Sequence, residues 1–277
     1  MSNKKEFSVK KELVVKSNRL IEASYRLSLV EQQIVMFAIC RSREEERGLS
    51  PDTHVTIRAA EFAAQFGTNE ANVYKQLRDA MTSLFSREVR IRDTDPKTGK
   101  PRVIDTRWIS DKAYIDGEGE IQITFAPRMI PFITRLEPEF TKYRLDKIGN
   151  MTSTHAIRLY ELLVQYLTVG KREIEISWLK EILQLENEYP RLFDFKKWVI
   201  DVAVTQINEH SNIYVSYTQC KTGRAVTHLI FEIKAKEQIK KLMLVAKTPV
   251  ISARGSDARA NPGESQTEFN RRMAVRG

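Results

Sequence analysis

Residues 55–66, VTIRAAEFAAQF, decide the fold because they are echoed without a gap by residues 174–185, IEISWLKEILQL. In each copy, apolar residues first alternate and then recur at helical spacing, which predicts a strand that runs into a helix. A second helical segment and a pair of strand-like segments around a turn follow each copy. The same small module therefore occurs twice, and its element order predicts an α+β fold of two tandem winged helix-turn-helix domains related as a pseudo-repeat.

Specific apolar residues carry the pattern in each copy. Val55 and Ile57 alternate in the first copy and Ile174 and Ile176 in the second, so we expect these four residues in strands. The helices that follow are marked by Ala59, Phe62, Ala63 and Phe66 in the first copy and by Trp178, Ile182 and Leu185 in the second. Two reading helices on one chain can address two successive major-groove faces of a duplex without a dimer.

The composition is that of a folded protein with a polyanionic partner. The chain has 277 residues, of which 42% are hydrophobic and 29% are charged, and its net charge is +9. Two domains of ordinary size fit this length, and we expect them at residues 1–136 and 137–247. The excess of Lys and Arg favours nucleic acid as the partner. Residues 248–277 are polar without apolar periodicity, and they predict a disordered tail.

Cysteine usage and the lack of long apolar runs point to a reducing compartment. Cys40 and Cys220 are the two cysteines, too few for a disulfide framework or a zinc cluster, so we expect two thiols. The first residues mix charges throughout without an apolar core of signal-peptide length, and no later run reaches the ~18 residues of a membrane span. We therefore expect a cytoplasmic protein without a membrane partner.

In the first module, Ser28 and Glu31 have the spacing of a capping box at the start of a helix. A later helix over residues 69–86 places Asn72, Lys75 and Arg78 on the side opposite its apolar stripe, and this side is the first predicted reading surface. Strands at 88–92 and 102–110 flank the turn-rich segment DTDPKTGKP, which we interpret as the wing. A further strand pair is expected around residues 116–119, and a short helix over roughly 127–136.

The second module has its own predicted reading helix and wing. The helix starts after Pro190 and runs to about His210. Its expected inward residues are Phe195, Trp198, Val199, Val202 and Ala203, and its expected outward residues are Lys197, Asp201, Thr205 and Asn208. Strands at 213–217 and 229–233 flank a turn with a basic tip, residues 221–224.

Basic and amide side chains gather on these two helices and two turns. Near the start of a reading helix, Arg or Lys can read guanine and Asn or Gln can read adenine, while wing residues hold phosphates. The predicted DNA-binding residues on the helices are Asn72, Lys75, Arg78, Arg191, Lys196 and Lys197, and those on the turns are Lys97, Lys100, Arg102, Lys221 and Arg224. Asp79, Asp194 and Asp201 lie near the same faces and would repel phosphate, so not every outward position can be a contact.

Catalytic readings have little support in the sequence. It lacks the phosphate-binding loop pattern of an ATPase, and its four histidines are far apart, without the clustered ligands that a metal-assisted nicking site needs. The pair His155 and Arg158 matches a fragment of the tyrosine recombinase pattern at chance-level spacing. We therefore expect a binding protein that is not an enzyme and that uses no metal or cofactor.

Leucine-type residues near the start fall on a seven-residue register, at Leu13, Leu20, Leu27 and Ile34. A short coiled-coil dimer seam is one interpretation. Because residues 26–28 look like a break between two helices, burial against the first module is the favoured interpretation.

Two further stretches resemble a known family. Residues 18–39, NRLIEASYRLSLVEQQIVMFAI, and residues 195–217, FKKWVIDVAVTQINEHSNIYVSY, are similar to the iteron-binding replication initiators of theta-replicating plasmids in Gram-negative bacteria. The resemblance extends over roughly residues 10–236.

The resemblance implies a function for the whole chain. A monomer would bind directly repeated iterons of double-stranded DNA, open the adjacent A+T-rich duplex, and recruit the host replication initiator and replicative helicase. A homodimer in equilibrium with the monomer would bind an operator and repress the protein's own gene. It also implies that the second winged helix provides the stronger grip on DNA. The alternative is a winged-helix transcription repressor with no role in replication.

Overall fold

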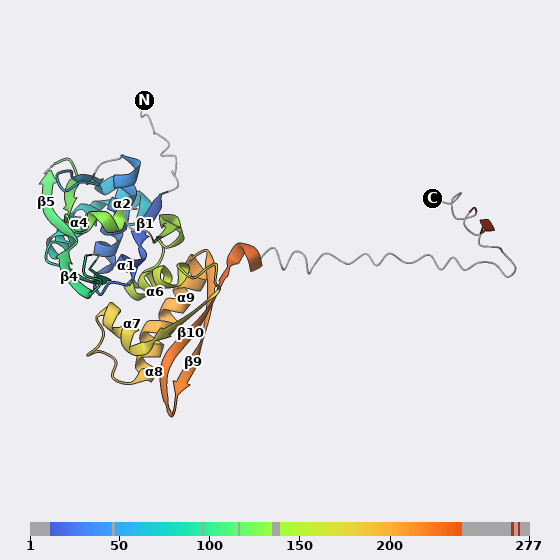
Figure 1. The fold of residues 1–277 in the computed structure, drawn as a ribbon. Helices are drawn as coiled ribbons and strands as arrows, with labels where there is room; N and C mark the ends of the chain where they lie inside the picture. The colour runs from blue at the N-terminus through green and yellow to red at the C-terminus, as the bar shows by residue number, and fades with distance from the viewer. Residues whose placement is uncertain are drawn as a thin grey trace. The chain divides into compact units, whose positions relative to one another are not determined.

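The computed structural model describes residues 12–45, 48–95, 97–115, 117–134, 139–239, 267, 268 and 271. The chain separates into a unit over Met1–Gln238 and a second unit over Ile239–Gly277. All elements discussed below lie in the first unit, in which two winged-helix modules follow one another (Figure 1). The predicted disordered tail, residues 248–277, lies outside the described residues except for 267, 268 and 271.

The chain enters the first module through a strand that the sequence did not predict. Strand β1 (Leu13–Ser17) pairs antiparallel with β7 (Phe140–Arg144), and Ser17 caps the short helix α1 (Asn18–Ile21). The residues of the seven-residue register do not form a helical seam. Leu20, Leu27 and Ile34 are buried in the core, which confirms the interpretation as packing rather than as a zipper.

The first half of the module matches its prediction. Helix α2 (Leu29–Glu44) begins at a complete capping box, in which the Ser28 and Glu31 side chains each bind the other's backbone N–H. Strand β2 (Val55–Arg58) runs into α3 (Ala59–Phe66), which ends where Gly67 takes the left-handed conformation with φ 63°. Helix α4 (Glu70–Leu84) then buries its predicted apolar stripe against α2 and α3.

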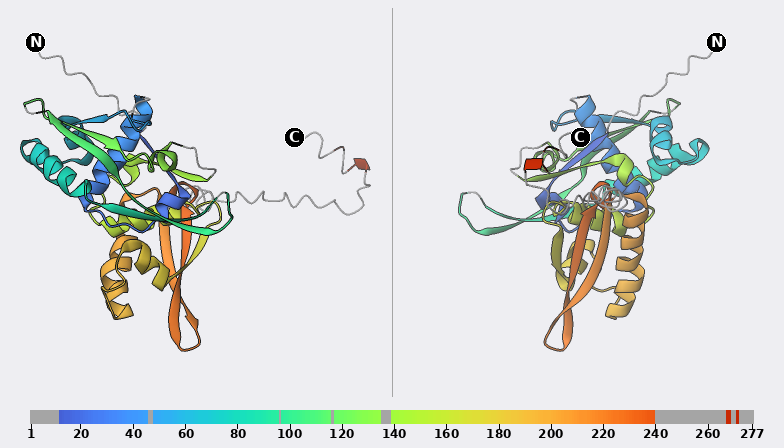
Figure 2. Two further views of the ribbon diagram at one scale, coloured as in Figure 1. Left: turned by 60° about the vertical axis from the view of Figure 1, so that its left-hand side comes forward. Right: turned by 90° about the vertical axis from the view of Figure 1, so that its right-hand side faces the viewer.

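The wing of the first module is not where the sequence placed it. Strands β3 (Glu88–Thr94) and β4 (Pro101–Arg107) form a separate two-stranded sheet. Strands β5 (Ile109–Ile115) and β6 (Glu120–Phe125) join β2 in a three-stranded sheet of order β2-β6-β5. The wing is therefore the β5–β6 turn, and the DTDPKTGKP segment is the tip of an additional hairpin, the teal hairpin of Figure 2.

Short elements lead from the first module into the second. Helix α5 (Ile130–Ile133) lies within the short helix predicted near residues 127–136, and the 3-10 helix η1 (Leu145–Lys147) follows β7. Helix α6 (Thr154–Val164), capped by Ser153, is the first helix of the second repeat. Within the described ranges, none of the helices combines the length and the apolar character that crossing a bilayer requires.

The repeat is real, but its register is two residues off the ungapped sequence match. Strand β8 (Lys171–Glu175) ends before α7 (Ile176–Leu183), so Ile176 opens the helix instead of extending the strand. Since α3 and α7 both have eight residues, Ala59 is equivalent to Ile176 and not to Trp178. Val55 then corresponds to Arg172, which is buried and donates to the Leu162 carbonyl and to Glu22. A buried arginine breaks the apolar alternation, which explains the shifted prediction.

The predicted reading helix of the second module contains a wide turn. Helix α8 (Leu192–Phe195) continues through the π-helical turn η2 (Lys196–Ile200) into α9 (Asp201–His210). Strands β9 (Ile213–Thr222) and β10 (Ala225–Ala235) follow, and the sheet order is β8-β10-β9. This order repeats the β2-β6-β5 arrangement of the first module, so the β9–β10 turn is the second wing, as predicted.

Candidate nucleic-acid interface

The π turn decides which side chains the second reading helix presents. The N–H of Asp201 donates to the carbonyl of Lys196, five residues back instead of four. The extra residue brings Phe195 into line with Val199, Ala203 and Ile207, and these residues are buried. A continuous α-helix would have placed Trp198 and Val202 on the inner stripe with Phe195.

Trp198 and Val202 are therefore exposed, and their predicted inward position was wrong. Asn208 was also misplaced, since its side chain exchanges hydrogen bonds with the backbone of Val215 at 2.7 and 2.8 Å instead of facing outward. The i, i+4 series of Phe195, Val199, Ala203 and Ile207 was present in the sequence and is the signal that could have indicated the correct stripe.

The cations predicted on this helix lie at its start. Arg191 precedes the first turn and is exposed, and its guanidinium is 2.6 Å from the Asp194 carboxylate. Lys196 is half-buried, and Lys197 is exposed with its ammonium 4.7 Å from the centre of the Trp198 ring. The pairing of Asp194 with Arg191 neutralises one of the acidic residues that would repel phosphate.

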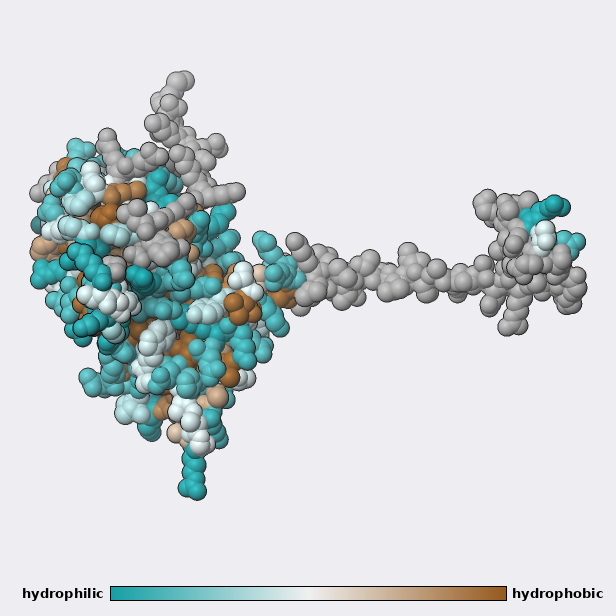
Figure 3. Space-filling model, in the orientation of Figure 1, coloured by the Kyte–Doolittle hydropathy of each residue, from teal (hydrophilic) through white to brown (hydrophobic). Residues whose placement is uncertain are grey.

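The second wing is basic and is tied to the reading helix. Lys221 and Arg224 are exposed beside Gly223, which takes φ 65° at the turn. Tyr217 on β9 donates a 2.6 Å hydrogen bond to Asp201 on α9. Burial and this carboxylate raise the pKa of Tyr217. The hydrophilic tip of the β9–β10 hairpin is the lowest point in Figure 3.

The first module presents polar residues on its reading helix but acid at its wing. Asn72, Lys75 and Arg78 are exposed on α4, as predicted, and the Arg78 guanidinium lies 5.2 Å from the centre of the Tyr114 ring on β5. The described wing residues 117–119 include the exposed Glu118 and no cation.

The remaining predicted contacts lie on the additional hairpin. Lys97 and Lys100 are exposed near the turn between β3 and β4, where the Asp95 carboxylate accepts from the backbone N–H of Lys97. Arg102 is paired with Asp93 at 2.6 Å and with Asp95 at 3.4 Å. Its hydrogen bonds lower the pKa of Asp93. Arg102 is thus already engaged by two carboxylates.

A buried ion cluster joins the start of the chain to the second repeat. Lys16 on β1 is 2.6 Å from Glu161 on α6, and Tyr143 also donates to this carboxylate. Burial raises the pKa of Glu161, but the charges of Lys16 and Arg158 and the hydrogen bonds from Lys16 and Tyr143 outweigh it, so the pKa is lowered. Arg158 donates to the backbone carbonyls of residues 21 and 23, so the predicted match to a recombinase fragment falls on a buried residue with structural partners.

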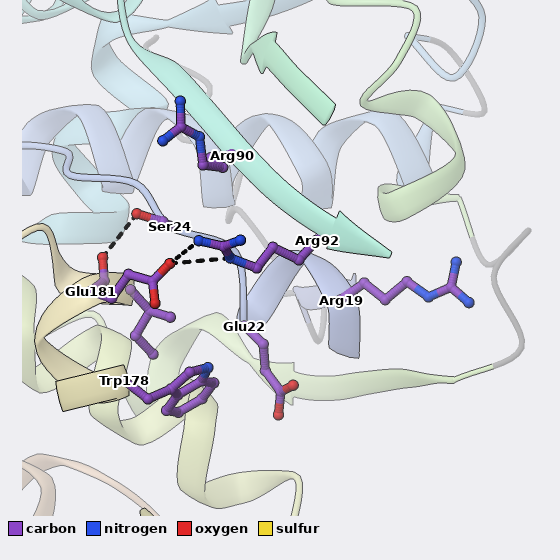
Figure 4. A pocket seen from close by; sticks show the side chains of 8 residues that line it. Arg19, Glu22, Ser24, Arg90, Arg92, Trp178 and Glu181 are labelled. Atoms are coloured by element: carbon purple, nitrogen blue, oxygen red, sulfur yellow. Dashed lines mark hydrogen bonds and ion pairs between the residues drawn. The ribbon is translucent and has the colours of Figure 1, made fainter. Parts of the chain in front are cut away.

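A small cavity lies where the additional hairpin meets α7 (Figure 4). Arg92 on β3 donates to the carboxylate of Glu181, and the hydroxyl of Ser24 donates to the Glu181 carbonyl at 2.9 Å. Trp178 on α7 lines the same cavity. These contacts make the additional hairpin a brace between the two repeats.

Together, the repeated sheet order, the basic reading helix and the basic wing define a tandem winged-helix protein of the nucleic-acid-binding class. Residues 13–164 match the family described as "Initiator Replication protein, WH1", and residues 175–233 match "Initiator Rep protein, WH2". The chain therefore belongs to the family of plasmid replication initiator proteins.

The chain is also similar to individual proteins. The chain is 26% identical over 235 residues to a "Replication initiation protein" of Escherichia coli, covering 82% of this chain and 72% of the relative. It is 24% identical over 230 residues to an "Uncharacterized 27.6 kDa protein" of Escherichia coli, covering 80% and 95%. The fold is also that of the crystallised Pi initiator protein in complex with iteron DNA, with a TM-score of 0.67 and 22% identity over 81% of this chain and 97% of that one.

Proposed function

We propose that this protein starts replication of a plasmid by binding, as a monomer, directly repeated iterons of duplex DNA with both modules. The observation that carries the proposal is the second module, in which a basic helix start and a basic wing tip lie at the same end of one module (Figures 1 and 2). A reading helix fills the major groove while a wing contacts the neighbouring backbone, and this arrangement suits that division of work.

The contacts can be ranked by their surroundings. Arg191, Lys196, Lys197, Lys221 and Arg224 make the main contacts in the proposal. Asn72, Lys75 and Arg78 make the contacts of the first module. Lys97 and Lys100 reach phosphates from the additional hairpin. Arg102 contributes least because two carboxylates hold its guanidinium and its side chain is 35% exposed, whereas Arg191 has one carboxylate partner and is 78% exposed.

The further steps follow from the resemblance to the family. The bound monomers open the adjacent A+T-rich duplex and recruit the host replication initiator and the replicative helicase. A homodimer binds an operator and represses the protein's own gene.

Footprinting on DNA that flanks the coding sequence tests the proposal. We expect protection of direct repeats, each about 20 base pairs long, on one face of the duplex, because two reading helices would enter major grooves about one turn apart. Binding that neutralises ~6–10 phosphates falls by roughly 10³ to 10⁵ between 50 and 200 mM salt. A single inverted operator with no direct repeats would favour a repressor without a role in replication, and equal affinity for unrelated duplexes would contradict the proposal.

A further inference from the structure

The second reading helix carries three large apolar side chains on its solvent side. Phe193 is 69% exposed, Trp198 is 56% exposed and Val202 is 36% exposed. The same helix carries Arg191, Lys196 and Lys197. The start of this helix lies at the same end of the module as the wing tip (Figures 1 and 2). The other exposed large hydrophobic residues of the described chain lie apart from this helix: Val103 on β4, Val169 in the turn after α6 and Tyr214 on β9.

A group of exposed apolar side chains on a functional surface marks a binding site, whereas scattered single ones are ordinary. The position of Trp198 and Val202 is built into the backbone, because the π turn moves them off the buried stripe. The cations around them match a polyanion. An occupant must therefore combine dense negative charge with exposed apolar groups.

We propose that Phe193, Trp198 and Val202 recognise thymines by packing against their C5-methyl groups in the major groove. The methyl of thymine is the apolar group that base pairs display there, and it distinguishes an A·T pair without a hydrogen bond. The cations of the same helix hold the flanking phosphates. This inference rests on the proposed function, in which this helix enters the groove.

The first module offers an internal contrast. The exposed side chains described on α4 are polar: Asn72, Lys75, Gln76, Arg78, Asp79 and Thr82. This helix suits hydrogen-bond recognition of bases. Dependence on the thymine methyl is therefore confined to the part of the site that the second module reads.

Deoxyuridine substitution tests the inference directly. Duplexes carrying the footprinted repeat are made with one thymine at a time replaced by uracil, which removes the methyl and keeps every hydrogen bond. We expect affinity to fall about fourfold at each contacted thymine, the effect of about one buried methyl group. Two or three adjacent positions within one half of the repeat should respond, and thymines in the other half should not.

Variants assign the positions to side chains. In Phe193→Ala and Trp198→Ala, the uracil effect should disappear at one contacted position each, while the remaining positions keep it. Val169→Ala removes an equally exposed apolar side chain away from the helix and should leave every uracil effect unchanged. Because these residues are exposed, the thermal midpoints of the variants should match the wild type, and this is measured alongside.

The outcomes separate this inference from the function on which it rests. Specific binding to the repeat with no uracil effect at any thymine, or with the same effects in both helix variants, overturns thymine recognition and leaves iteron binding intact. Absence of specific binding to the unmodified repeat overturns the proposed function itself. If Trp198→Ala weakens self-association in sedimentation while the uracil effects persist, the apolar face serves a second copy of the chain, and thymine recognition is wrong.

Discussion

The two modules share one fold but not one surface. In both modules, the strand that follows the first helix pairs with the second strand of the wing. The reading helix lies between these two strands in the sequence. The second module has cations at its wing and at the start of its reading helix, and an apolar strip beside them. The first module has a polar reading helix and the exposed acid Glu118 at its wing.

This difference shows how duplication can separate two tasks. The sheet order and the short α3 and α7 helices are common because they build the core. The wings and the exposed helix faces differ because packing does not constrain them. We infer that the second module supplies most of the affinity and that the first module sets register on the DNA while also carrying the additional hairpin that braces the repeats.

The comparison of the two modules assumes that the buried ion cluster around Glu161 holds them together. Glu161→Gln tests this assumption. The substitution leaves Lys16 and Arg158 buried without a charge partner, and breaking a buried ion pair in this way costs about 3–5 kcal/mol. The free energy of unfolding from urea titration measures the loss. Arg92→Ala, which removes the largely exposed pair with Glu181, is the matched control and should cost about 0–1 kcal/mol. Equal losses in the two variants would show that the buried cluster does not hold the two modules together.

The unequal contribution of the two modules to DNA affinity is tested by removing cations from one reading helix at a time. Arg191→Ala, Lys196→Ala and Lys197→Ala combined should weaken binding to the footprinted repeat about 10²-fold, from about 1 kcal/mol for each contact. The combination of Lys75→Ala and Arg78→Ala on α4 should cost about tenfold or less. Fluorescence anisotropy at fixed salt measures both. A larger loss from the α4 pair would reverse the ranking of the modules.

Most of the fold was predictable from local patterns, and the failures share one physical cause. Caps, helical stripes and turn residues act within a few positions, so local patterns predict α2, α3, α4 and the β9–β10 hairpin where the structure has them. A hairpin sequence does not state which sheet it joins, because strand pairing is non-local, and local pattern alone therefore predicts the DTDPKTGKP turn as the wing. Likewise the strand β1 depends on its partner β7, which is more than a hundred residues away.

The candidate site was less predictable than the fold. Exposure of most of the predicted cations was foreseeable because charged side chains on a helix face away from the core, although Lys196 and Arg102 are half-buried. The π turn itself has no local signal, and it reverses the assignment of Trp198 and Val202; only the i, i+4 series from Phe195 to Ile207 indicates the buried stripe. The register of the second copy was also unpredictable from local pattern. Arg172 is buried in a strand because its partners, a carbonyl on α6 and Glu22, come from other parts of the chain.

Acid should destabilise the contact between the two modules through Glu161. The pKa of Glu161 is lowered in the folded state, so the unfolded chain binds more protons as the pH falls below the carboxyl's ordinary value of 4.5. The stability from this group is fully present above that value and is lost as the pH falls through the lower folded-state pKa. Urea titrations between pH 6 and 3 should show a steeper loss for the wild type than for Glu161→Gln. Parallel curves would mean that the carboxylate does not contribute this way.

The smallest expected effect comes from a substitution that makes the first wing resemble the second. Glu118→Lys gives the first wing a cation at a described, exposed position on the β5–β6 turn and so makes it resemble the second wing. If this turn lies near the DNA backbone, one added phosphate contact should increase the magnitude of the salt slope of binding by about 0.9. The affinity at low salt should rise several-fold. Glu118→Gln separates loss of repulsion from gain of a contact, because it should raise the affinity without the full change in slope. No change in either variant would place the first wing away from the duplex, and the first module would then act through α4 alone.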